Sequence, residues 1–272
     1  MIPYCSSDSH IERTEKVCRM TIENYRLFTA RDIPDLGEKT HVLTGSAWPE
    51  FMLQDPLANE YFGRLYVEFP YYQFVLMHPE TEEIIALGNS IPLAWDRPAE
   101  ELPDEGWDWA IAQGFRDREA GLTPTVQCAL QVVVKDGWQG NGLSASMVRT
   151  MKSIGRRVGL SALIAPVRPN RKCDYPLTPM ERYVHWRRDD GLPFDPWMRV
   201  HARLGAEVIR PCMRAMYIPG TIADWESWTG MTFPDSGRYV IPKALVPIDI
   251  DRDRDQGLYV EPNVWMRHPL NE

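Results

Sequence analysis

The clearest pattern in the chain is an apolar stretch, a glycine-rich turn, an amphipathic stretch and a second apolar stretch. Residues 125–134 are almost uninterruptedly apolar, which predicts a strand buried on both faces in the middle of a sheet. After the turn, apolar residues recur at helical spacing among Arg and Lys: Leu143, Met147, Val148, Met151, Ile154 and Val158. Gly159 ends this predicted helix, and residues 161–167 predict a second buried strand. The order predicts a βαβ unit with parallel strands.

The residues before this unit show the same two periodicities in weaker form. They predict a helix over residues 11–28, one or two helices over 48–69 with a break at Pro56, a hairpin of strands at 72–77 and 83–88, and an inserted helix within 98–121. The segment 78–82 joins the hairpin strands, because its His-Pro-Glu-Thr-Glu sequence is typical of a turn.

The residues after the unit alternate loops with short elements. They predict a long loop over 168–196 with a short helix near 180–187, a helix over 197–204, β-prone runs at 207–209 and 213–218, a capped helix from Thr221 to Gly230, and tail strands that include 239–241 and 259–261. The predicted fold class is mixed α/β. We expect one elaborated domain over residues 1–272, with its core at 125–218 and a C-terminal extension at 219–272.

Composition and charge exclude several classes of protein. Hydrophobic residues make up 44% of the chain, yet they form no run of about 18 apolar residues, and the first residues lack an export signal. We therefore expect no membrane partner and a cytoplasmic location. The formal net charge of -8 argues against a nucleic-acid partner, since phosphate binding needs an excess of Lys and Arg.

No metal site is expected. The 5 cysteines are widely spaced and form no Cys-x-x-Cys pair, so reduced thiols are expected. The acidic run 249–257 has some features of a calcium loop, but counting from Asp251 places Pro262 where the loop needs a bidentate Glu. We interpret this run as a solvated turn.

The turn Gln139-Gly140-Asn141-Gly142 carries the strongest functional signal. A strand that runs through glycines into a helix brings free N–H groups and the positive end of the helix dipole together, which favours phosphate binding. The phosphate loop of nucleotide hydrolases is excluded because Gly-Lys-Ser/Thr is missing. A dinucleotide fingerprint at 140–145 is an alternative, although residues 160–165 contain no acid for the ribose.

Over a longer window, residues 134–144 resemble the acyl-CoA-binding motif of the GNAT (general-control-related N-acetyltransferase) superfamily. That motif reads Arg/Gln-x-x-Gly-x-Gly/Ala after a strand that ends in Val. Gln139 matches the first position and Gly142 the central glycine, whereas Ser144 departs from the final Gly/Ala.

A second match lies further along the chain. GNAT proteins follow the next strand with an Asn and later place a Tyr four residues before a Gly that opens the last hairpin. Asn170 stands at the first of these positions, and His201 stands where the Tyr is usual, before Gly205. The resemblance covers about residues 125–218, with a long insertion after Asn170.

The resemblance implies a fold and a donor. The fold is a GNAT-like mixed central sheet flanked by helices, with an N-terminal helical elaboration, an insertion after the second core strand and a C-terminal extension. The donor, acetyl-CoA or another acyl-CoA, would lie along Val132 and Val134, near Asn170. Its pyrophosphate would bind the segment after the strand: Gln139, Gly140, Asn141, Gly142, Leu143 and Ser144.

The implied reaction is acyl transfer to an amine of a small-molecule acceptor by direct attack on the thioester. Such transfer needs a proton donor for the departing thiolate. His201 is the candidate, weighed against a histidine packed in the core. Gln127 and Gln131 cannot take a proton, and Glu261 and His268 are candidates for the general base by residue type alone.

Two further groups are candidates for binding. One is a set of tryptophans that would line an acceptor pocket or pack in the core: Trp48, Trp95, Trp107 and Trp109. The other is a basic set that would surround the donor phosphates or lie in solvent: Arg149, Arg156, Arg168, Arg171 and Lys172.

Three functional hypotheses therefore stay open beside acyl-CoA-dependent transfer. The donor could be an acylated carrier protein, whose phosphopantetheine arm and acidic surface suit a basic patch. The chain could also sense acyl-CoA without catalysis, since the usual Tyr is missing, or it could be the dinucleotide oxidoreductase. A homodimer is one assembly open to the chain.

Overall fold

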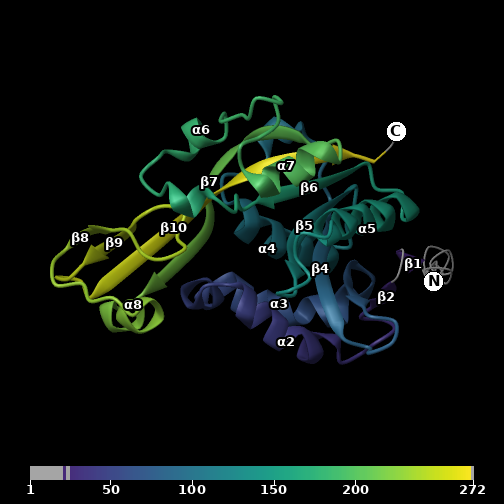
Figure 1. Ribbon diagram of the computed structural model, residues 1–272, viewed down its shortest axis with the longest axis horizontal. Helices are drawn as coiled ribbons and strands as arrows, with labels where there is room; N and C mark the ends of the chain where they lie inside the picture. Colours follow the sequence, from purple (N-terminus) through teal and green to yellow (C-terminus); the bar gives the residue numbers. More distant parts are fainter. Residues whose placement is uncertain (1–20, 23–24, 271–272) are drawn as a thin grey trace, which may run out of the picture.

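A mixed sheet runs through the molecule. The computed structural model describes residues 21–22 and 25–270 (Figure 1). In spatial order the strands are β1 (Thr21–Ile22), β2 (Tyr25–Thr29), β3 (Gln73–Met77), β4 (Ile84–Leu93), β5 (Val126–Val134), β6 (Ala162–Val167), β10 (Gln256–Pro269), β9 (Ile248–Asp251) and β8 (Gly237–Tyr239), with β7 (Glu207–Gly220) paired to β10. These strands confirm the predicted fold class.

The expected helix over residues 11–28 is wrong where the structure describes it, and residues 1–20 lie outside the described part. Tyr25–Thr29 is the strand β2, which pairs antiparallel with β3 from Arg26↔Met77 to Thr29↔Phe74. Leu27 and Thr29 are buried while Arg26 is exposed. This alternation is the period-two pattern of a strand with one buried face, and it differs from the helical spacing expected for this segment.

The predicted βαβ unit is confirmed. Strand β5 leads into α5 (Leu143–Arg157), and β6 returns parallel to β5. The two strands pair only from Val126↔Ala162 to Cys128↔Ile164. Beyond this point both strands continue without pairing to each other, so the sheet splits between Ala129–Val134 and Ala165–Val167.

A β-bulge at Leu130 turns the side chains of β5 just where the split begins. Asn89 of β4 pairs with Gln131 and Ser90 pairs with Ala129, which leaves Leu130 unpaired. Before the bulge Cys128 belongs to the core cluster of α4, whereas Val132 and Val134 pack with the cluster of α5. The bulge therefore aims alternate residues of the strand's last half toward the split.

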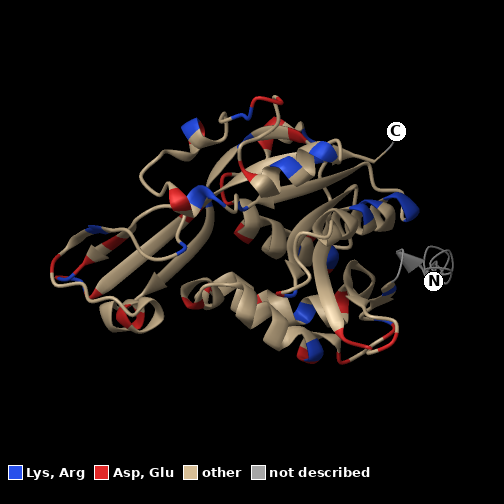
Figure 2. Ribbon diagram, viewed as in Figure 1, with Lys and Arg blue, Asp and Glu red and all other residues tan. Residues whose placement is uncertain are grey.

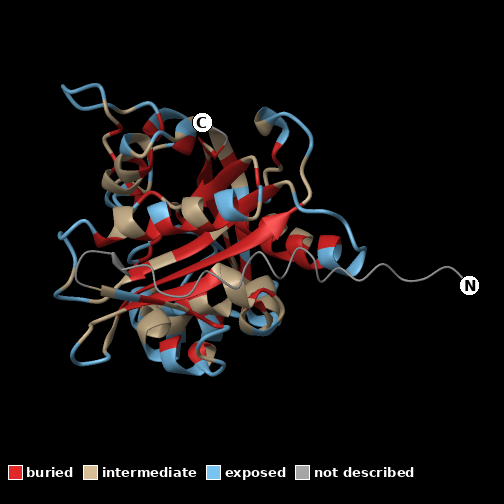
Figure 3. Cartoon of the chain, turned by 90° about the vertical axis from the view of Figure 1, so that its right-hand side faces the viewer, coloured by how far each residue is buried: buried red, intermediate tan, exposed pale blue. Residues whose placement is uncertain are grey.

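Helices cover both faces of the sheet (Figure 3). One face packs on α5, beside which lies α7 (Pro196–Arg203). The other packs on α4 (Gly106–Glu119), which contacts α3 (Pro56–Glu68). The remaining helices are α2 (Leu36–Ala47), α6 (Met180–Tyr183) and α8 (Ile222–Thr229), with short 3-10 helices at Glu50–Gln54, Pro70–Tyr72, Ala99–Glu101 and Lys172–Asp174.

Most of the helix predictions are confirmed, with shifts at the ends. Pro56 starts α3 instead of interrupting a helix, because Asp55 caps it through Ala58 N (2.8 Å) and a proline is tolerated in the first turn. The capping box at Thr221 and Asp224 is present in α8. Helix α6 is shorter than predicted, and α2 was not predicted, since its apolar residues do not follow helical spacing closely.

The C-terminal part extends the sheet. Strand β7 is continuous from Glu207 to Gly220 and pairs with β10 along its length, so the two separate runs that the sequence suggested are one strand. Strands β8 and β9 with α8 lie at the end of this ribbon away from α5 and α7 (Figure 1). In the part of the chain that the structure describes, no helix is both long and apolar enough to cross a membrane.

Candidate active site

The turn between β5 and α5 is shaped to receive an anion. Gly140 and Gly142 have left-handed φ angles of 83° and 76°, and a Cβ at either position would meet nothing within 4 Å. Gly142 is the N-cap of α5, and among the described residues no side chain caps this helix. Its first N–H groups are therefore available to a ligand, at the positive end of the helix dipole.

A cavity of about 980 Å³ begins at this turn and enters the split between β5 and β6. Most of the predicted donor residues line it: Val132, Val134, Gln139, Gly140, Leu143, Ser144 and Asn170. Asn141 and Gly142 belong to the same turn but are exposed and outside the cavity lining. The side chain of Gln139 donates to the carbonyl of Val134 (3.2 Å) and to Asp136 (3.1 Å), so it stabilises the turn.

His201 also lines the cavity, from α7. Its side chain is buried, and its Nδ1 lies 2.9 Å from Nε2 of His268 on β10, which is buried too. Nε2 of His201 has no hydrogen-bond partner within the described chain. The sequence predicted a helix that contains His201 and ends before Gly205, but it gave no sign that a second imidazole, that of His268, would contact it.

Both imidazoles are neutral at physiological pH. Burial, together with the neighbouring His268, lowers the pKa of His201 to about 3. Burial and the ammonium of Lys152 lower the pKa of His268 to about 4, against a smaller opposing effect of the Leu204 carbonyl. His201 can therefore act as a neutral hydrogen-bond donor or acceptor, and it is not an imidazolium acid.

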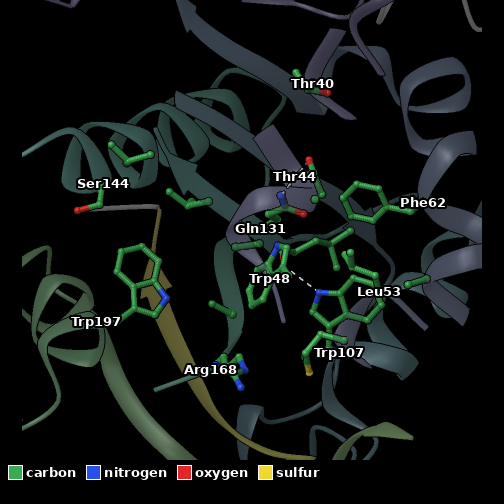
Figure 4. A pocket seen from close by; sticks show the side chains of 18 of the residues that line it. Thr40, Thr44, Trp48, Leu53, Phe62, Trp107, Gln131, Ser144, Arg168 and Trp197 are labelled. Atoms are coloured by element: carbon green, nitrogen blue, oxygen red, sulfur yellow. Dashed lines mark hydrogen bonds between the residues drawn. The ribbon is translucent and has the colours of Figure 1, made fainter. Parts of the chain in front are cut away.

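The opposite side of the cavity is aromatic and aliphatic (Figure 4). Trp48, Phe62 and Trp107 line it with Leu53, and Trp107 is held by a hydrogen bond from Nε1 to the carbonyl of the bulged Leu130 (2.9 Å). The other two predicted tryptophans do not contribute. Trp95 and Trp109 pack edge to face, with their ring centres 5.4 Å apart, and neither lines the cavity.

The predicted basic cluster around the donor phosphates is not formed. Arg171 pairs with Asp174 (3.0 Å), and Lys172 is fully buried, with its ammonium donating to the carbonyls of Leu245 (2.6 Å) and Tyr175 (2.9 Å). Arg168 forms an ion pair with Glu261, in which Nε of Arg168 lies 2.9 Å from Oε1 of Glu261. Lys and Arg do gather along α5 and α7, where Arg149 is exposed (Figure 2).

Two buried carboxyl groups, those of Asp55 and Asp108, lie next to each other outside the cavity lining. Asp108 accepts from Tyr217 N (2.9 Å) and Asp55 from Ala58 N (2.8 Å), while the remaining oxygen of each has no donor elsewhere in the described chain. Burial, then the Asp55 carboxylate, raises the pKa of Asp108 to about 9, and burial raises the pKa of Asp55. The pair therefore holds a proton at neutral pH.

The sequence interpretation missed the polar residues that β10 and its neighbours bring to the site. Glu261 and His268 were considered only by residue type, yet both are fully buried. One signal was present, since Glu261 and Asn263 interrupt the apolar run from Leu258 to Met266, and His268 follows shortly after it. A charged residue within a buried strand generally has a partner.

The chain is similar to characterised proteins over most of its length. No family model matches it. It is 32% identical to the arginine N-acetyltransferase avaD of Aspergillus versicolor, over 91% of this chain and 94% of that one.

Solved structures share the fold at lower identity. The loading GNATL domain of CurA from Lyngbya majuscula matches with a TM-score of 0.59 and 20% identity, over 90% of this chain and 98% of that one. The GphF GNAT-like decarboxylase, solved with isobutyryl-CoA, matches with a TM-score of 0.55 and 17% identity, over 90% of this chain and 100% of that one.

Proposed function

Because this chain belongs to the GNAT superfamily of N-acyltransferases, we propose that it transfers an acetyl group from acetyl-CoA to a nitrogen of arginine, or of a small molecule that contains arginine. The observation that carries the proposal is the split between β5 and β6, which starts at the uncapped helix α5 and ends at the aromatic wall. The acceptor is suggested by the relative, an arginine N-acetyltransferase.

The geometry supports a division of the cavity between the two substrates. The amides at the start of α5 would bind the diphosphate, and the pantetheine arm would follow Val132 and Val134 into the split. The acceptor would enter from the side of Trp48 and Trp107. A cationic guanidinium binds well against aromatic faces such as those of Phe62 and Trp107, which line the cavity.

Transfer proceeds by direct attack. The neutral acceptor nitrogen forms a bond to the thioester carbon, the carbon–sulfur bond breaks, and the proton that the nitrogen loses balances the one that the thiolate gains. We assign His201 a hydrogen bond from Nε2–H to the leaving sulfur. In this tautomer Nδ1 of His201 accepts from Nε2–H of His268, as their 2.9 Å separation allows.

The His201→Ala variant should lose about 30-fold in kcat, because the departing thiolate loses a buried hydrogen-bond donor. The KM for acetyl-CoA should change less, since its phosphates bind elsewhere. Because the pKa of His201 is about 3 and that of His268 about 4, neither titrates near neutrality. We therefore expect kcat, measured by steady-state kinetics from pH 5.5 to 8, to show no titration of His201 near pH 6.5. A change in kcat with a midpoint near pH 6.5 that is present in the wild type and absent in His201→Ala would contradict the neutral role.

The test of the function is direct. The protein is incubated with acetyl-CoA and arginine, and the product is identified by mass spectrometry, with fragmentation to place the acetyl group on the α-nitrogen or on the guanidine. Acetylarginine formed at a rate that depends on enzyme concentration supports the proposal. Tight binding of acetyl-CoA by calorimetry, with no transfer to any amine, would instead make the chain a sensor.

A carrier protein is the second candidate donor, favoured by the Lys and Arg residues along α5 and α7 (Figure 2), two helices that also contribute residues to the cavity lining. It suits the likeness to a loading domain, although that likeness establishes the fold alone. Acetyl groups on phosphopantetheinylated carrier protein and on CoA should be offered in parallel. Faster transfer from the carrier protein than from CoA would identify the carrier as the donor, bound at the same site.

A further inference from the structure

Arg168 is the one Lys or Arg that lines the cavity within the described residues. It follows β6 directly, at the split, and its guanidinium lies 5.9 Å from the ring centre of Trp48 on the acceptor side (Figure 4). We infer that Arg168 binds the carbonyl-type oxygen of the acceptor's arginine, as a carboxylate or as an amide. This inference rests on the proposed function, because it assumes an arginine-type acceptor.

The guanidinium is fixed before any acceptor arrives. Its Nε donates to both oxygens of Glu261 (2.9 and 3.0 Å), and its Nη2 donates to the carbonyl of Lys243 (2.8 Å). Glu261 is itself held by the hydroxyl of Tyr259 (2.8 Å). No hydrogen bond joins Nη1 to another residue of the described chain, so this nitrogen of the fixed guanidinium remains as a donor for a ligand.

The chemistry of this donor selects its ligand. An arginine side chain has only N–H donors and no acceptor, so its open side recognises an oxygen and repels the cationic guanidinium of the acceptor. Asn263 lines the cavity on neighbouring β10 and adds a side-chain amide. An acceptor would therefore place its carbonyl end at Arg168 and its cationic end away from it.

Local charge permits a carboxylate here. Glu261 balances Arg168, and the nearby Asp55 and Asp108 hold a proton, so an added anion faces little repulsion. Burial is the largest single influence and opposes the charge of Arg168, but the charge and hydrogen bond of Glu261, together with Tyr259 and Cys173, outweigh burial and raise the pKa of Arg168. The side chain is thus cationic throughout the working pH range.

Three acceptors test the assignment on the wild-type protein: arginine, argininamide and agmatine, which lacks the carbonyl group. We expect agmatine to show at least a 30-fold lower kcat/KM than the better of the other two, because Arg168 is left without its oxygen. A preference for arginine over argininamide identifies a carboxylate, and equal use of both identifies a neutral carbonyl. Agmatine used as well as arginine overturns the assignment alone, whereas no transfer to any of the three overturns the proposed function with it.

The Arg168→Lys variant separates recognition from structure. Lysine keeps a cation for Glu261 but cannot offer a second fixed donor, so kcat/KM should fall about 30-fold for arginine and stay unchanged for agmatine. Arg171→Lys is the matched control, since Arg171 is nearby, partly exposed and paired with Asp174. If Arg168→Lys fails to fold, the pair Arg168→Gln with Glu261→Gln removes both charges together. An equal loss for both acceptors in a folded variant shows a purely structural role.

Discussion

The Gly142→Val variant is expected to lose about 1,000-fold in affinity for CoA, or about 4 kcal/mol of binding free energy. Gly142 begins α5 with a left-handed φ of 76°, and a side chain there projects into open space in front of the first amides of the helix. A branched group would occupy the volume that a diphosphate needs and would also strain the turn. Calorimetry with CoA measures the loss.

Gly159→Val is the matched control for this substitution. Gly159 has a φ of 80° and nothing within 4 Å of its Cβ, as Gly142 has, but it lies after the opposite end of α5. Both variants should therefore lose similar stability in thermal unfolding, and Gly159→Val alone should keep its affinity for CoA. Unchanged affinity for CoA in a folded Gly142→Val variant would contradict diphosphate binding at this turn. Equal losses of CoA affinity in both variants would show that backbone strain, and not a blocked site, causes the effect.

The part of the fold that the sequence predicts best is the part with strong local periodicity. The βαβ unit was predicted within one or two residues, because a buried strand, two turn glycines and an amphipathic helix each leave a local pattern. Most of the residues predicted to bind the donor lie within this unit, so it was also predictable that several of them would line one cavity: Val132, Val134, Gln139, Gly140, Leu143 and Ser144. Helix α2 and strand β2 left weaker patterns, since their form depends on pairing and packing with distant residues.

The paired polar groups beside the cavity could not be predicted from local patterns. Arg168 and Glu261 are 93 residues apart, and His201 and His268 are 67 apart. These pairs exist because β10 returns antiparallel beside β6, with Trp265 opposite Pro166. A single sequence contains no sign of that strand order. The β-bulge at Leu130 left no local pattern either, although it sets which residues of β5 face the split.

The second large effect concerns stability. Asp108→Asn should stabilise the protein by up to about 4 kcal/mol at pH 7, because wild-type folding must keep a proton on a carboxyl group that would otherwise be ionised. The pKa of Asp108 is raised to about 9 by burial, and its ordinary value is 3.8. Asparagine keeps the shape, accepts from Tyr217 N as Asp108 does, and offers a donor to Asp55.

The pH dependence identifies the cause of the stabilisation. Between pH 4 and pH 9 the folded state holds the proton and the unfolded state does not, so the contribution of Asp108 to stability falls as pH rises. The free energy of unfolding of Asp108→Asn, measured by urea denaturation against wild type, should therefore gain an advantage that grows by about 1.4 kcal/mol per pH unit. Asp104→Asn is the control with the opposite sign, because the pKa of Asp104 is lowered by Arg210 and its ionised form supports folding. An advantage of Asp108→Asn that stays constant from pH 5 to pH 8.5 would show that the carboxyl pair holds no proton, and that packing alone distinguishes the two side chains.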